Sequence, residues 1–254
     1  PLTIVTLRVG LAAITLWLVV LALKLPIPNS PPIWIAFLTM GLLNNVLPFS
    51  LIDWGQSQIS SGLAAILNAT APLFGVIVAG ILLRDESATP LKITGVVVGF
   101  AGVIVMMDLS SIATSSLLAQ LAILAAALSY ACASVYGRRF KATGLNPILV
   151  AAGQVTGSTL LLLPIALWVD GNDPYANMPA QVWAAIISLA MFSTAAAYIL
   201  YFKLLASAGA TNILLVTLLV PVSAILLVWL FLEESLQTPH IIGMAMIALV
   251  LSAI

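Results

Sequence analysis

The stretch Gly62–Leu83 reads GLAAILNATAPLFGVIVAGILL and decides the fold class. It holds 22 consecutive residues without a charge, and one helix needs about 20 mostly apolar residues to cross a bilayer. Its apolar positions are continuous rather than alternating, which argues against the strand of a membrane barrel. The stretch is therefore predicted to be a transmembrane helix.

The composition of the whole chain agrees with an integral membrane protein. Of 254 residues, 63% are hydrophobic and 6% are charged, whereas a soluble domain has about 25% charged residues. The eight basic side chains are balanced by eight acidic ones. Because the chain has no excess of basic residues, nucleic acid is not an expected partner. Cys132 is the only cysteine and His240 the only histidine, so no metal site, disulfide or cofactor is predicted.

The same criterion, applied along the chain, predicts an all-α protein with nine transmembrane helices. The predicted spans are 3–23, 33–53, 62–83, 91–107, 117–137, 146–168, 182–203, 210–232 and 240–254. Short segments rich in Pro, Gly, Asn and Ser separate them.

The basic residues predict the orientation of these spans. Under strict alternation seven of them fall on one side, and only Arg8 lies toward the other. Basic residues accumulate in cytoplasmic loops. The C-terminus is therefore expected in the cytoplasm, and the expected location is the inner membrane. The seven are Lys24, Arg84, Lys92, Arg138, Arg139, Lys141 and Lys203, and the acids Asp53, Asp108, Asp170, Asp173, Glu233 and Glu234 fall on the opposite side.

The middle of the chain repeats near its end at an offset of 149 residues. Pro72 falls on Pro221, Leu83 on Leu232, and Thr89-Pro90 on Thr238-Pro239. Five spans separate the copies, an odd number, so the second copy is expected to be inverted in the membrane. Inverted repeats are typical of transporters that bind solute near the midplane.

The repeat predicts two domains, 1–108 and 117–254. Spans 5 to 9 form a complete five-helix unit, whereas spans 1 to 4 lack the counterpart of its first helix. We therefore expect a tenth, N-terminal helix to precede Pro1 in the full protein.

Several segments resemble the EamA type of the drug/metabolite transporter superfamily. They include Gly62–Phe74, Ala127–Ala131 with Arg138-Arg139, Ala197–Phe202, Gly209–Thr211 and Val220–Glu234. The resemblance implies ten helices in two inverted repeats, and transport of small metabolites, often amino acids. Two positions depart from the family pattern: Tyr130 stands where the family often has Trp, and Arg84-Asp85-Glu86 replaces a Gly-Glu pair.

Polar side chains in the middle of two spans are the first candidates for solute contacts. Asn44 and Asn45 lie near the centre of span 2, and their counterparts at the 149 offset are Ser193 and Thr194 in span 7. Such residues face a cavity or a partner helix. The two interpretations, cavity lining and interhelical hydrogen bonding, both stay open at this point.

Two prolines in mid-span are candidate hinges. Pro72 and Pro221 each free the carbonyl four residues earlier, which belongs to Asn68 or Thr217. A free carbonyl at membrane depth lines a cavity or is satisfied by neighbouring groups. A simple kink satisfied by nearby Ser or Thr is the alternative.

Tyrosines complete the predicted site. Thr194, Tyr198 and Tyr201 share one face of span 7, and Tyr130 lies in span 5. Anchoring at the membrane interface is the alternative for Tyr201. We predict a pocket near the midplane lined by Asn44, Asn45, Asn68, Tyr130, Thr194, Tyr198 and Thr217.

The predicted pocket is neutral, because no basic or acidic residue lies near the centre of any span. This favours a zwitterionic or aromatic solute over a phosphorylated one, which would need Arg or Lys. No residue set predicts a catalytic site, since Cys132 has no histidine partner in its span and His240 lies at a helix end.

The function predicted is transport of small organic solutes, amino acids or related metabolites, by alternating access with export as the direction. A structural membrane subunit and an intramembrane enzyme are the alternatives. The expected partners are the lipid bilayer and a small-molecule solute, and formation of a homodimer stays open.

Overall fold

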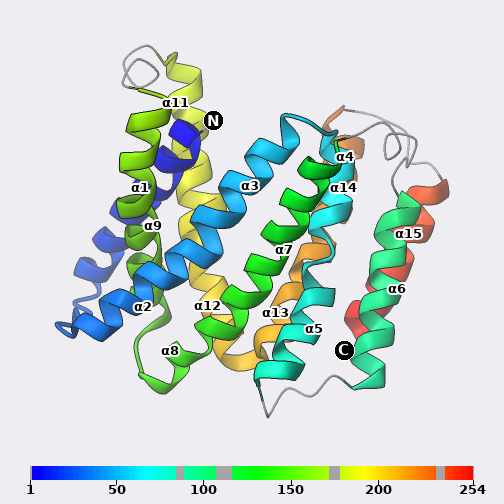
Figure 1. Ribbon diagram of the computed structural model, residues 1–254, viewed down its shortest axis with the longest axis horizontal. Helices are drawn as coiled ribbons and strands as arrows, with labels where there is room; N and C mark the ends of the chain where they lie inside the picture. Colours follow the sequence, from blue (N-terminus) through cyan, green and yellow to red (C-terminus); the bar gives the residue numbers. More distant parts are fainter. Residues whose placement is uncertain (1, 84–88, 107–115, 172–177, 233–237, 254) are drawn as a thin grey trace. The chain divides into compact units, whose positions relative to one another are not determined.

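A computed structural model describes residues 2–83, 89–106, 116–171, 178–232 and 238–253, and this part of the chain is built of helices without a strand (Figure 1). Arg84, Asp85, Glu86, Asp108, Asp173, Glu233 and Glu234 lie outside the described residues. The first half contains α1 (Leu2–Ala22), α2 (Pro31–Gly41), η1 (Leu42–Val46), α3 (Leu47–Gln56), α4 (Ser61–Asn68), α5 (Ala71–Leu82) and α6 (Pro90–Met106). The second half contains α7 (Leu117–Gly137), α8 (Arg139–Ala142), α9 (Pro147–Val169), α11 (Ala180–Ser188), η3 (Leu189–Ala196), α12 (Ala197–Ala208), α13 (Ala210–Leu214), η4 (Leu215–Leu218), α14 (Leu219–Leu232) and α15 (Thr238–Ala253).

Each predicted span falls on one helix or on a few consecutive helical elements. Within the described ranges, six helical segments are long and apolar enough to cross a membrane, and three shorter apolar helices cover Pro90–Val105, Ala210–Ser223 and Thr238–Val250. The prediction of an all-α, multi-pass membrane protein is confirmed. The orientation and the identity of the membrane stay predictions.

Four spans depart from regular α-helix in mid-span. Two contain π-helix, η1 and η3, in which backbone hydrogen bonds skip one residue more than in an α-helix. A third breaks at Ala69 and Thr70, between α4 and α5, and a fourth contains the 3-10 segment η4. At the 149 offset, Leu42–Val46 falls within η3, and Leu215–Leu218 falls on the end of α4 and the break after it. The irregularities therefore recur at the spacing of the sequence repeat, and the inversion of the halves in space stays a prediction.

The helices form two compact units, and each unit draws on both halves of the chain. Unit 1 comprises 1–50 and 136–207, and unit 2 comprises 51–135 and 208–254. The boundaries fall within α3, α7 and near the end of α12. The two sequential domains predicted above stay a prediction, because a compact unit is a different division from a sequence repeat.

Unit 1 is built around α9, which α1 and α2 pack against; η3 packs against α1 (Figure 1). Glycines bring the backbones of α2 and α9 into contact. A Cβ atom on Gly41 would lie 2.7 Å from the carbonyl oxygen of Gln154, and one on Gly157 would lie 2.8 Å from the carbonyl oxygen of Phe37. Small residues at helix crossings are the usual device for close packing in lipid. They bring η1, which continues α2, close to α9.

Unit 2 contains two apolar clusters. In one, α6 packs along α15 and α5 packs against α13, with Leu218 and Ile247 almost fully buried (Figure 1). In the other, Ile59 and Leu63 pack against Ala119 and Ile123 of α7. Both clusters consist of buried aliphatic side chains contributed by several helices of this unit.

Candidate functional site

Each of the two π-helical segments of unit 1 carries two adjacent polar side chains. Asn44 and Asn45 lie in η1, and Ser193 and Thr194 lie in η3. A π-helical turn interrupts the regular ladder of backbone hydrogen bonds and is frequent at functional sites. The Thr194 hydroxyl has the same five-residue spacing as the backbone bonds of a π-helix, because it donates to the carbonyl of Leu189 at 3.1 Å.

The side chains of η1 form a hydrogen-bonded network with α9. The Asn44 amide donates to Gln154 Oε1 at 3.2 Å, and the Asn45 amide donates to Ser158 Oγ at 2.8 Å. Asn45 Oδ1 accepts from Gln154 Nε2 at 3.1 Å and also from the hydroxyl of Tyr198. Asn45, Gln154 and Ser158 are fully buried, and Asn44 is 3% exposed. The network is therefore neutral and closed.

Both asparagines thus form hydrogen bonds between helices. This is one of the two interpretations that the sequence left open, the other being cavity lining. Asn45 uses its amide group and its carbonyl oxygen within the protein. Buried polar groups that are all paired rigidify a helix contact, since losing one partner leaves another group unsatisfied. The network fixes η1 on α9 in this conformation.

Sequence reasoning missed Gln154 and Ser158, the two α9 residues that bind η1. They stand four residues apart, which places both on one face of a helix. A polar pair at this spacing inside the apolar span 146–168 is a signal that could have identified them.

The polar side chains of η3 are bound by a cation. Arg8 Nε donates to Thr194 Oγ1 at 2.7 Å, and Arg8 Nη2 donates to Ser193 Oγ at 3.3 Å. The guanidinium carbon lies 5.0 Å from the ring centroid of Phe49, within the distance of a cation–π contact. Arg8 is half-buried, Thr194 is buried and Ser193 is exposed.

Arg8 lies beside Thr194, a residue of the pocket that the sequence predicts to be neutral. The sequence places Arg8 toward the outer end of the span 3–23, and in the structure it lies in the first half of α1, four residues before Ala12 at its midpoint. At 1.5 Å per residue that is about 6 Å along the helix axis. Arg8 is the only charged residue of α1, and that isolation is the signal that could have identified it.

Asp170, at the end of α9, accepts two hydrogen bonds from the start of α1. The backbone N–H and the hydroxyl of Thr3 donate to Asp170 Oδ2 at 2.8 and 2.6 Å. Burial raises the pKa of the Asp170 carboxyl, but the hydrogen bonds from Thr3 and the positive charge of the chain's amino group together outweigh it, so the pKa lies below its ordinary value. Asp170 follows α9 directly and therefore links its end to the first turn of α1.

A row of aromatic rings joins the η1 network at Tyr198, whose hydroxyl bonds to Asn45. Tyr198 contacts Tyr201 at right angles, with ring centroids 6.2 Å apart, and Tyr201 contacts Phe202 in the same way at 5.1 Å. The Tyr201 hydroxyl is buried, and no described residue bonds to it. Burial of this hydroxyl favours an internal role for Tyr201 over anchoring at the membrane interface, the alternative considered for it.

The remaining predicted residues belong to unit 2. Asn68 ends α4, and its buried Oδ1 has no hydrogen-bond partner among the described residues. The Thr217 hydroxyl donates to the Leu214 carbonyl at 2.8 Å within η4, and Tyr130 is half-buried on α7. Asn44, Asn45, Thr194 and Tyr198 are residues of unit 1. That all seven line one pocket stays a prediction.

The two candidate hinge prolines lie where helices restart. Pro72 is in the first turn of α5, directly after the break at Ala69 and Thr70, and Pro221 is in the first turn of α14, directly after η4. Proline fits the first turn of a helix because the missing N–H has no partner there. A hinge role for the prolines stays a prediction.

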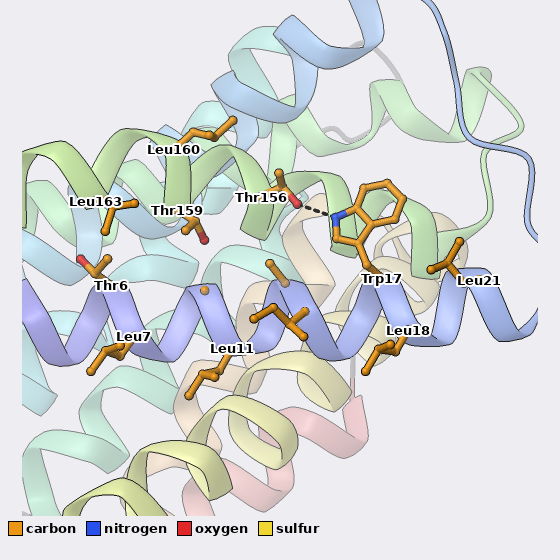
Figure 2. Close-up of a pocket in the computed structure, with 13 residues that line it drawn as sticks. Thr6, Leu7, Leu11, Trp17, Leu18, Leu21, Thr156, Thr159, Leu160 and Leu163 are labelled. Carbon is orange, nitrogen blue, oxygen red and sulfur yellow. Dashed lines mark hydrogen bonds between the residues drawn. The ribbon is translucent and has the colours of Figure 1, made fainter. Parts of the chain in front are cut away.

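A hollow of about 540 Å³ lies between α1 and α9 (Figure 2). Its walls are mostly aliphatic, and the Trp17 indole N–H donates to Thr156 Oγ1 at 2.8 Å within it. None of the seven predicted site residues lines it. The hollow is therefore separate from the polar clusters of η1 and η3. Among the described residues no group of three His, Cys, Asp or Glu side chains is arranged to hold a metal ion.

Comparison with known proteins gives one family. Residues 1–108 and 117–254 match the EamA-like transporter family. The chain is 28% identical to the uncharacterized transporter YvbV of Bacillus subtilis, over 84% of this chain and 69% of YvbV. It is 25% identical to the uncharacterized transporter YoaV of the same bacterium, over 97% of this chain and 84% of YoaV.

A solved crystal structure superposes on the chain with a TM-score of 0.81 at 19% identity. The match covers 100% of this chain and 86% of the other. It shows that the two proteins share a fold.

Proposed function

The chain belongs to the EamA-like transporter family, and we propose from this premise that it exports small organic solutes across the inner membrane. The proposed solutes are amino acids or related metabolites, and the proposed mechanism is alternating access. The family and the relatives named as transporters indicate a membrane transporter rather than an enzyme.

The observation that carries the proposal is the pair of π-helical segments at the 149 offset. η1 and η3 interrupt two membrane-crossing helices at corresponding positions, and each presents polar side chains. Interrupted helices near mid-membrane, at corresponding places in two repeats, are the usual solute and coupling sites of secondary transporters. A structural subunit would not need such a costly arrangement of polar groups in lipid.

We propose the seven residues predicted from the sequence as the ones to test for solute contact, with Pro72 and Pro221 as hinges. Tyr198 is the most informative, because its hydroxyl bonds to Asn45 while its ring contacts Tyr201. Motion of η1 relative to α12 would break that hydrogen bond and free both groups for a solute. Asn68 is the most informative residue of unit 2, since its buried oxygen has no described partner.

Counterflow in proteoliposomes tests the proposal. The full-length protein is reconstituted, the vesicles are loaded with an unlabelled amino acid, and uptake of the labelled form is measured across a panel of amino acids and small organic acids. We expect counterflow for at least one solute, and a several-fold decrease for Tyr198→Phe and for Asn68→Ala.

The matched control is Tyr136→Phe, because the Tyr136 hydroxyl accepts a hydrogen bond from exposed Arg139 outside the η1 network. No counterflow in any vesicle would favour the structural-subunit alternative. A solute that is chemically altered rather than moved would favour the enzyme. Normal counterflow in both variants would remove Tyr198 and Asn68 from the site.

A further inference from the structure

We infer that the Arg8 guanidinium binds the carboxylate group of the transported solute. The inference rests on the proposed function, because it assigns a solute class to that transporter. By this inference the solute must carry a carboxylate, whereas the neutral pocket predicted from the sequence does not require one.

The first argument is the missing counter-charge. A charged side chain within a spanning helix is costly, and such residues pair with one another or mark a solute pathway. A guanidinium does not lose its proton at accessible pH. The described partners of Arg8 are two hydroxyls and an aromatic ring, and no described carboxylate pairs with it. The positive charge is therefore solvated by dipoles but not neutralised.

The second argument is which edge of the guanidinium is used. Its five N–H bonds form two forks, one along the Nε/Nη2 edge and one at the Nη1/Nη2 end. Thr194 and Ser193 occupy the Nε/Nη2 edge. No described residue accepts from Nη1, so the end fork keeps its donors. That fork matches the two oxygens of a carboxylate.

The third argument is orientation with access. The hydrogen bonds to η3 and the Phe49 ring hold the plane of the guanidinium, so little freedom is lost when a second planar group binds. Arg8 is half-buried and Ser193 beside it is exposed, so neither residue is sealed inside the helix packing. The η1 network lacks this property, because Asn45 is fully buried with its groups paired.

The choice of carboxylate over phosphate follows from charge. Arg8 is the only charged residue in α1, α2, η1, α9 and η3. A phosphate monoester carries about 1.5 to 2 negative charges at neutral pH and three acceptor oxygens. One guanidinium would leave much of that charge unpaired, whereas it neutralises a single carboxylate.

The test compares each amino acid with its own carboxamide, which has nearly the same shape without the charge. In counterflow, wild type is expected to prefer the carboxylate. Arg8→Gln should raise KM for the carboxylate about tenfold or more, because a charge-assisted hydrogen bond is lost. KM for the carboxamide should stay unchanged. Arg8→Lys, which keeps the charge but not the fork, should recover part of the preference.

Arg139→Gln is the matched control. Arg139 also lies over an aromatic ring, 4.7 Å from the Tyr136 centroid, and donates to a hydroxyl, that of Tyr136, at 2.7 Å. It is exposed and lies in α8, at the end of the apolar segment Leu117–Ala142, so this variant should keep the wild-type preference. An Arg8→Gln protein that still prefers carboxylates would overturn the inference and leave the transporter function standing.

A second measurement needs no flux. Phenylglyoxal modifies guanidinium groups, and the extent at Arg8 is read by mass spectrometry of the reconstituted wild-type protein. Benzoate should slow modification of Arg8 at least twofold, whereas benzamide and inorganic phosphate should not. Equal rates with benzoate and benzamide, or protection by phosphate alone, would refute a carboxylate site. Protection without counterflow would refute the transport proposal while the binding site stands.

Discussion

The two π-helical segments of unit 1 occupy corresponding positions in the sequence repeat but differ in chemistry. In η1 the polar side chains Asn44 and Asn45 are buried and bonded to α9. In η3, Thr194 and exposed Ser193 are bonded to the cation Arg8, whose Nη1 has no described acceptor. The same backbone irregularity therefore serves a closed neutral contact in one helix and an open charged one in the other.

The difference teaches what a polar residue in a membrane helix does. A paired amide in a dry contact fixes the distance between two helices, because each lost bond leaves a buried group unsatisfied. A charge with spare donors instead keeps a place for a ligand that supplies the opposite charge. Stability is therefore expected to depend on η1, and solute choice on η3.

The largest effect is expected from separating η1 from α9. Gly41→Ala places a Cβ atom 2.7 Å from backbone atoms of Gln154 and Ser158, which cannot move as a side chain can. Overpacking of this kind costs about 1–3 kcal/mol, and we expect the upper end. Thermal unfolding of the purified protein in detergent measures it. Gly10→Ala is the control, because its Cβ would lie 3.5 Å from Thr159, an ordinary contact. Equal stability of the two variants would contradict the close contact of α2 with α9.

The next effect is expected inside the η1 network. Asn45→Ala removes the partner of Gln154 Nε2, Ser158 and Tyr198, so the free energy of unfolding should fall by about 1–3 kcal/mol. Asn44→Ala removes one side-chain hydrogen bond, to Gln154, and should cost less. Chemical denaturation of both variants gives the order. The distinction between a closed and an open segment fails if Asn44→Ala is the more damaging.

A smaller effect on stability, but a visible one on transport, is expected at η3. Thr194→Val keeps the size of the side chain and removes the oxygen that accepts from Arg8 Nε. We expect KM for carboxylate solutes to rise about threefold, with the thermal midpoint nearly unchanged, since a net hydrogen bond is worth about 0.5–1.5 kcal/mol. Ser193→Ala, with its longer 3.3 Å bond, is the weaker comparison variant. A large loss of stability with unchanged KM would assign η3 a purely structural role.

The smallest effect is expected at Asp170, a titratable group that belongs to neither segment. Neither network titrates in acid, because amides and hydroxyls are not acidic there and arginine stays protonated. The Asp170 carboxyl has a lowered pKa, so its contribution to stability is present above the ordinary aspartate pKa of about 3.9 and is lost as pH falls through the folded value. Asp170→Asn should remove that part of the pH dependence. If the acid dependence is unchanged in this variant, the contact with Thr3 does not contribute.

Several features could be predicted from the sequence because they depend on local composition. The nine spans follow from runs of apolar residues, and the helices of the described ranges coincide with them. The special positions also follow: Asn44, Asn45 and Thr194 lie in π-helix, and Pro72 lies beside a helix break. A polar group or a proline in an apolar span is costly wherever it stands, so its position alone is informative.

Only the tertiary structure decided which groups meet. Arg8 and Thr194 are 186 residues apart, and Asn44 and Gln154 are 110 apart. The helix face that α1 turns toward η3 brings the first pair together, and the close contact of α2 with α9 brings the second together. Both contacts depend on how side chains pack along whole helices. In lipid an apolar helix face has a similar free energy against another helix and against acyl chains, so hydropathy does not select the neighbouring helix. The sequence therefore determined which segments cross the membrane and where they are irregular, and packing decided that the side chains of η1 are bonded by amides and those of η3 by an arginine.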